Sequence, residues 1–154
     1  MYYIMSELFK DQLVLFLVMF VIGVVFNDMN MMAYRFNDIY LSLTLIYSGL
    51  FMASNMIWGH QIVHYITMGH FNAKIFSIGV LLSIGCVLLL RNQVFVNATQ
   101  WLRQMIGHHS SAITSTTLLL ENDDNFKYDS YLFTLAKNIE YQQDREILMM
   151  KNML

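Results

Sequence analysis

Proline is absent from this 154-residue chain, cysteine occurs once, and only 13% of the residues are charged. The single cysteine, Cys86, excludes a framework of intramolecular disulfide bonds. The formal net charge of -2 provides no basic face, which excludes nucleic acid as a partner. Hydrophobic residues make up 56% of the chain, more than a soluble core of this size can bury.

The motifs of common enzyme classes are also missing. A ferritin-like di-iron centre needs Glu-x-x-His motifs, and no Glu in this chain has His at that spacing. There is no HExxH motif, Gly-rich phosphate loop or Ser-His-Asp order, and the adjacent His109 and Ser110 do not make a catalytic pair. We therefore expect that the chain is not an enzyme.

Three apolar segments approach the length that crosses a bilayer, about 20 residues. They cover residues 13–26, 39–58 and 75–90. A cleavable signal peptide is disfavoured for the first segment, because Lys10 is offset by Glu7 and Asp11 and no small-residue cleavage site follows. The sequence therefore predicts a multi-pass integral membrane protein with the lipid bilayer as its partner.

Polar connections separate these segments. Residues 27–38 are predicted to form a short link, with Asp38 as the N-cap of the second helix. Gly69 is a candidate C-cap and Asn72 the next N-cap. In the third segment, Gly79 and Gly85 would allow close approach of a neighbouring helix.

The C-terminal part is predicted to be a helical hairpin, with an amphipathic helix over 97–121, a polar turn over 121–125 and a last helix over 131–154. Two antiparallel helices bury only one face between them, so we expect a homo-oligomer, dimeric or higher, that completes a four-helix bundle. Packing of the hairpin on the membrane helices is the alternative. The expected fold is all-α, with a three-span membrane domain at 1–91 and a hairpin domain at 92–154.

Potential metal ligands lie on both hairpin helices. Met105 and His109 are four residues apart, so they stand one above the other, with His108 on the flank. The last helix carries Glu146, Met150 and Met153 along one stripe. Soft thioethers combined with imidazoles suit copper, and Cu(I) more than Cu(II). The alternative is that these residues are structural, and the abundance of Met is also typical of an AT-rich genome.

A second series of soft side chains lies at constant i+4 spacing in and beyond the second segment: Met52, Met56, His60, His64 and Met68. It predicts a ligand track that reaches the membrane surface, or an ion-conducting path in an oligomer. The alternative is ordinary packing by the methionines and a wet interface marked by the histidines beyond Trp58.

The hairpin also resembles a known family. The pattern Leu-x-x-Met-Ile-x-His-His-Ser-x-Ala-Ile at 102–113 and the pattern Leu-Ala-x-x-Ile-x-x-x-Gln-x-x-Glu-Ile-x-x-Met at 135–150 are similar to the bacterial family called domain of unknown function 305. The resemblance covers residues 93–154. It implies a small ferritin-like helical domain, associated in some members with copper, and some bacterial members carry three membrane helices ahead of it. Where the family usually has Pro before the His pair, this chain has Gly107, which costs about 1 kcal/mol relative to Ala within a helix.

Two functions follow as expectations. The first is a membrane-anchored protein that captures copper for tolerance, storage or delivery, with the hairpin domain extracytoplasmic as in the bacterial relatives. The second is a structural or assembly protein of a membrane or shell, with a degenerate metal site. The absence of Pro and the Asn-rich loops suit a viral or mobile-element origin, and Gly107 favours the second expectation.

Overall fold

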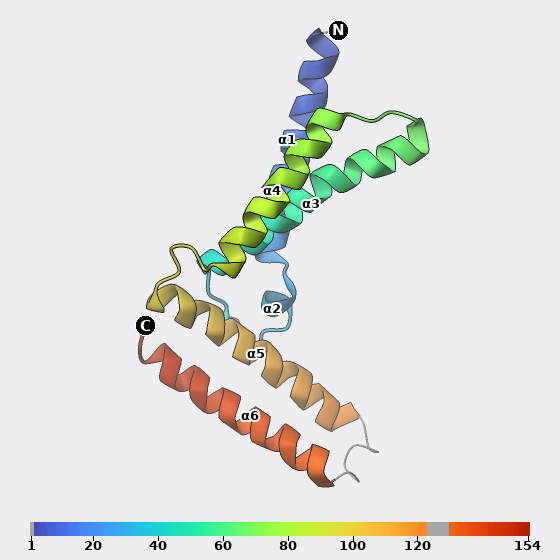
Figure 1. Cartoon of the computed structure of the whole chain (residues 1–154). Coiled ribbons are helices and arrows are strands. Elements are labelled where there is room, and N and C mark those ends of the chain that lie inside the picture. The colour runs from blue at the N-terminus through green and yellow to red at the C-terminus, as the bar shows by residue number, and fades with distance from the viewer. Residues whose placement is uncertain (1, 123–129) are drawn as a thin grey trace. The chain divides into compact units, whose positions relative to one another are not determined.

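The structure, a computed structural model, describes residues 2–122 and 130–154, and all regular elements in these ranges are helices (Figure 1). The predicted all-α class is confirmed. The chain divides into two compact units. The three-helix unit comprises Met1–Phe26 and Leu43–Phe95, and the hairpin unit comprises Asn27–Ser42 and Val96–Leu154. The predicted division at residue 91 does not anticipate that 27–42 group with the hairpin.

In the three-helix unit, α3 (Leu43–Met68) packs against both α1 (Tyr2–Val25) and α4 (Ala73–Arg91). The end of α3 and the start of α4 lie at the predicted caps. Gly69, with φ of +70°, terminates α3, and the Asn72 side chain accepts hydrogen bonds from the backbone N–H groups of Lys74 and Ile75, both at 3.2 Å. The turn between α3 and α4 is therefore fixed by local sequence.

The start of α3 differs from the sequence prediction. The helix begins at Leu43, and residues 39–42 have no regular structure. Asp38 does not cap α3. It ends the 3-10 helix η1 (Phe36–Asp38), and its fully buried carboxylate binds partners far along the chain. A local capping rule cannot anticipate this, because the competing partners are distant in sequence.

The interior of the three-helix unit contains many small and polar residues beside a few large ones such as Leu45 and Ile57, and many large apolar residues lie outside. Buried positions include Gln12, Gly49, Ala53, Ser54, Gln61, Gly79 and Ser83. Exposed positions include Leu13, Leu17, Val21, Ile66, Leu81, Ile84 and Leu88. So many exposed large apolar side chains are unusual on a soluble helical bundle.

Among the described residues, one helix, Ala73–Arg91, is long and apolar enough to cross a membrane by length and composition. One of the three predicted spans therefore passes this test, and the prediction of three spans is not supported. The second predicted span lies in α3, which also holds Asn55, His60 and Gln61, and these polar side chains lower the mean hydropathy of the helix.

The hairpin unit is built on α5 (Ala98–Asn122) and α6 (Ser130–Lys151), which pack against each other. Their shared core consists of Leu102, Ile106, Ile113, Ile147 and Met150. Helix α5 runs without interruption through Gly107. The predicted polar turn at 121–125 lies mostly outside the described residues.

The segment 27–42 covers the hairpin. It contains the short helix α2 (Asp28–Met31) and η1, which both contact α5, and Tyr40 packs on the shared core. The sequence prediction treated this segment as a link between membrane spans. The segment adds a third layer to the hairpin. The core is therefore not limited to the single face that two helices bury between them.

A buried polar network, here called the Asp38 network, attaches this segment. Ser110 Oγ donates to Asp38 Oδ2 at 2.7 Å and accepts from the backbone N–H of Tyr34 at 2.8 Å. The Lys151 ammonium lies 2.5 Å from Asp38 Oδ1. One carboxylate thus joins 27–42 to both α5 and α6.

Replacing Lys151 with Met is expected to destabilise the hairpin unit by about 3–5 kcal/mol, because Asp38 is left buried without its counter-charge. Hydrogen exchange of the α5 and α6 amides measures this loss. The double variant Asp38→Asn, Lys151→Met should recover part of it, since no uncompensated charge remains.

The matched control is Lys137→Met, which removes an exposed ion pair with Glu140 and should cost no more than about 1 kcal/mol. Equal effects of the two lysine changes would contradict the structural importance of Asp38.

Gly79→Ala is expected to destabilise the three-helix unit by about 1–3 kcal/mol, because a Cβ at Gly79 would lie 2.9 Å from the backbone nitrogen of Trp58 on α3. Gly85→Ala is the control on the same helix, since nothing lies within 4 Å of its added Cβ. It should be neutral or stabilising by up to about 1 kcal/mol. Unfolding in detergent compares the variants, and equal effects would refute a close α3–α4 contact at Gly79.

Candidate metal site of the helical hairpin

His109 on α5 and Glu146 on α6 face each other across the hairpin. Their Nε2 and Oε2 atoms are 3.2 Å apart, and the His109 side chain is only 13% exposed. The other ring nitrogen, Nδ1, is buried and has no hydrogen-bond partner. Buried polar atoms without a partner are rare in folded proteins, so this nitrogen requires an explanation.

Burial lowers the pKa of His109 below its ordinary value. The carboxylate of Glu146 acts in the opposite direction, and the neighbouring His108 lowers the pKa further. A lowered pKa favours the neutral imidazole. In the neutral tautomer that donates Nε2–H to Glu146, Nδ1 carries a buried lone pair directed away from the carboxylate.

Two thioethers lie one turn from this pair. Met150 is buried in the hairpin core, and Met105 packs against the same core cluster. Met105 precedes His109 by four residues on α5, and Met150 follows Glu146 by four residues on α6, so each thioether stacks beside its polar neighbour. The inner face of the hairpin therefore carries sulfur in one layer and the His109–Glu146 pair in the next.

A further polar atom on the same helix also lacks a partner. Gln143 Oε1 is buried without a hydrogen bond, one turn before Glu146. Gln143 belongs to the family pattern at 135–150, but it was not predicted to be part of the metal site. Its spacing of three from Glu146, which places both on one face, was the available signal.

The other two predicted ligands lie apart from this face. His108 is exposed, and its ring centroid is 6.0 Å from that of His109 at an interplanar angle of 80°. Met153 lies beyond the end of α6 and is 69% exposed. In the part of the chain that the structure describes, no three His, Cys, Asp or Glu side chains gather to hold one ion.

The methionines and histidines of the α3 track have different surroundings. Met52 Sδ would lie 3.1 Å from a Cβ added to Gly23, so this thioether lies beside α1. Met52, Met56 and Met68 are all exposed. The His60 and His64 rings are neighbours, with centroids 5.9 Å apart.

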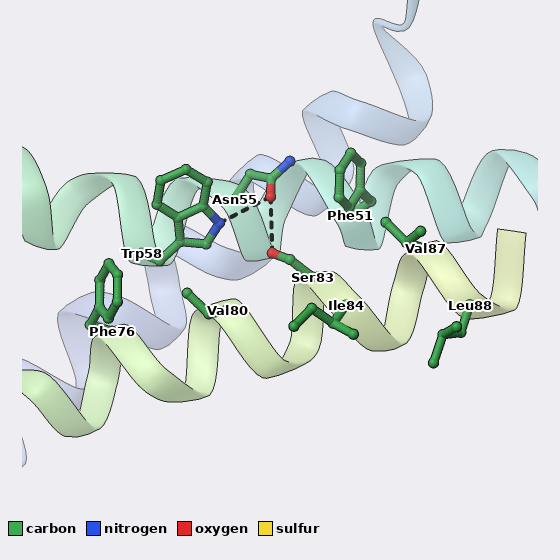
Figure 2. Close-up of a pocket in the computed structure, with 9 residues that line it drawn as sticks. All are labelled: Phe51, Asn55, Trp58, Phe76, Val80, Ser83, Ile84, Val87 and Leu88. Atoms are coloured by element: carbon green, nitrogen blue, oxygen red, sulfur yellow. Dashed lines mark hydrogen bonds between the residues drawn. The ribbon is translucent and has the colours of Figure 1, made fainter. Parts of the chain in front are cut away.

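The three-helix unit also has an apolar cavity of about 380 Å³ between α3 and α4, bordered by Phe51, Trp58 and Phe76 (Figure 2). Asn55 Oδ1 accepts from Trp58 Nε1 at 3.0 Å and from Ser83 Oγ at 2.9 Å. None of the residues that line the cavity is charged.

Comparison with known proteins places the hairpin in a family. The family model "Domain of unknown function (DUF305)" matches residues 97–154. "Uncharacterized protein L153" of Acanthamoeba polyphaga mimivirus is 32% identical over 128 residues, which are 83% of this chain and 81% of that protein. No solved structure matches the chain. The chain belongs to the domain of unknown function 305 family, as its sequence pattern predicted.

The lowered pKa of His109 has a consequence for stability. Because the native pKa lies below that of the unfolded chain, the unfolded state takes up a proton first as the pH falls. The free energy of unfolding of the hairpin should therefore decrease as the pH drops from about 6.5 toward the native pKa. Denaturant unfolding at pH 7.5 and 5.5 measures this change.

His109→Gln should lack that part of the pH dependence, and the exposed control His108→Gln should retain most of it. An unchanged pH dependence in His109→Gln would show that another group is responsible.

Proposed function

We propose that this chain is a membrane-attached metal-binding protein whose helical hairpin captures copper, with Cu(I) favoured over Cu(II). His109 is the central ligand, and copper is the cargo that the protein stores or delivers. The observation that carries the proposal is the buried Nδ1 of His109, which has no partner although the opposite ring nitrogen faces a carboxylate.

This arrangement is the one that metal-binding histidines use. A ligating imidazole commonly donates its second ring N–H to a carboxylate, which fixes the tautomer and orients the lone pair toward the metal. Glu146 supplies such a carboxylate at 3.2 Å. In this proposal Glu146 positions His109, and Nδ1 binds the ion.

The thioethers of Met105 and Met150 support copper over harder metals. Met105 lies one turn from His109 on α5 and Met150 belongs to the shared core, and soft sulfur with imidazole favours Cu(I). A Ca²⁺ or Mg²⁺ ion would need several oxygen ligands, which this face does not provide. His108 and Met153 lie outside the inner face and would contribute only after a rearrangement.

The exposed apolar surface of the three-helix unit supports membrane attachment through more than one helix. In a bilayer, small residues allow close helix contacts, while large apolar residues face lipid. Gly49 and Gly79 occupy such contacts, and Leu17, Leu81 and Leu88 point outward. We propose that α1 and α3 accompany α4 in the membrane, and that the hairpin unit is extracytoplasmic.

Exposed apolar residues on the hairpin support the expected homo-oligomer. Leu119 on α5 and Leu135 and Leu148 on α6 are each more than 40% exposed. A second copy could cover them and complete a four-helix bundle.

The test is Cu(I) binding by the detergent-purified full chain under reducing conditions, in competition with a chromogenic chelator. His109→Ala should lower the affinity by at least about tenfold, and Glu146→Gln by about 10–100-fold, as is typical of outer-shell partners. The exposed neighbour His108→Ala should change it much less.

Circular dichroism verifies that each variant folds, and His109→Gln replaces His109→Ala if it does not. No Cu(I) binding by the wild type, or loss only in His108→Ala, would refute the proposal.

A second candidate is a structural role in a membrane or viral shell. The mimivirus relative favours it, since the similarity covers 83% of this chain and therefore includes the three-helix unit as well as the hairpin. In that case the wild type would assemble into defined oligomers without binding copper, and His109→Gln would assemble as well as the wild type.

A further inference from the structure

Two histidines of the three-helix unit are arranged as a pair. His60 and His64 are one turn apart on α3, with ring centroids 5.9 Å apart and planes inclined by 36°. Both side chains are partly exposed, so an ion from solution can reach the outer edges of the rings.

Each ring is held through its Nδ1 atom. His64 Nδ1 lies 3.2 Å from the backbone oxygen of His70, and because a carbonyl only accepts, Nδ1 must carry the proton. The lone pair of neutral His64 is therefore on Nε2. A hydrogen bond from ligand Nδ1–H to a backbone carbonyl is one of the outer contacts that metal-binding histidines use.

His60 has a corresponding contact on α1. Its Nδ1 lies 3.1 Å from Nε2 of Gln12, a side chain that is only 6% exposed. Gln12 Oε1 is buried without a partner. The Gln12 amide can pair with either neutral tautomer of His60. Its nitrogen donates to Nδ1 when Nδ1 carries no proton. After rotation of the amide, its oxygen accepts from Nδ1–H. The second form leaves the lone pair of His60 on Nε2.

We propose that His60 and His64 form a metal-binding clamp for a divalent borderline ion, with Cu²⁺ bound most tightly. With metal–nitrogen bonds of roughly 2.0–2.1 Å, a ring centroid lies about 3.2 Å from the ion, so two rings on one ion have centroids at most about 6.4 Å apart. The observed 5.9 Å is within that limit. Water or an external donor completes the coordination.

The donor set selects the metal. Two imidazoles without thiolate or carboxylate suit Cu²⁺, Ni²⁺ or Zn²⁺, and the general order of affinity places Cu²⁺ first. The His70 ring, 6.3 Å from that of His64 and nearly perpendicular to it, lies beside the clamp without belonging to it. The turn that carries His70 is held by the buried Gln61, whose Oε1 accepts from the backbone N–H of Asn72 at 3.3 Å.

The test is a Cu²⁺ titration of the detergent-purified full chain by equilibrium dialysis, with electron paramagnetic resonance to count coordinating nitrogens. His60→Ala and His64→Ala should each lower the affinity of one Cu²⁺ site by more than about tenfold and remove one nitrogen from its spectrum. Gln12→Leu should lower it by about tenfold as an outer partner.

Two controls isolate the clamp. His70→Ala keeps the backbone carbonyl and should change the affinity less than about twofold, whereas a loss equal to that of His64→Ala would overturn a two-histidine clamp. The double variant His108→Ala, His109→Ala should leave this site intact, so its outcome does not depend on the copper site of the hairpin. Absence of Cu²⁺ binding in the wild type, or binding that only the hairpin variant removes, would also overturn the proposal.

Discussion

The Asp38 carboxylate is the interaction on which the hairpin unit depends. It is fully buried and shared between Ser110 on α5 and Lys151 on α6. Ser110 directly follows His109, and Lys151 directly follows Met150. Because neighbouring residues on a helix point about 100° apart, fixing one of each pair sets the rotation of both helices. The same contact therefore supports the core and aims His109 and Met150 at the inner face.

The two units satisfy their polar groups in different ways. The hairpin unit has an apolar core of Leu, Ile and Met, with its polar network at one edge. The three-helix unit places polar contacts between its helices, as in the bond from Ser83 to Asn55, and leaves many of its large apolar side chains outside. Close helix contacts and internal hydrogen bonds therefore contribute more to this unit than to the hairpin.

The sequence predicted what depends on local rules. Apolar runs indicated the first three long helices and periodicity the two of the hairpin, while Gly69 and Asn72 fixed the turn between α3 and α4. The i+4 spacing predicted that Met105 and His109 share one face, and the structure brings His109 to Glu146. The function of Asp38 was not predictable, because Ser110 lies 72 residues away and competes with a local capping role. The exposure of His108 was not predictable either, because its position next to His109 does not show which of the two side chains faces the hairpin core.

The surroundings of the histidines differ between the two proposed sites. The two sites would therefore prefer different oxidation states of copper. His109 is buried and lies in a face that also holds the thioethers of Met105 and Met150, and soft donors with little water stabilise Cu(I). His60 and His64 are partly exposed, so that water can complete the coordination of a bound ion, which suits Cu(II).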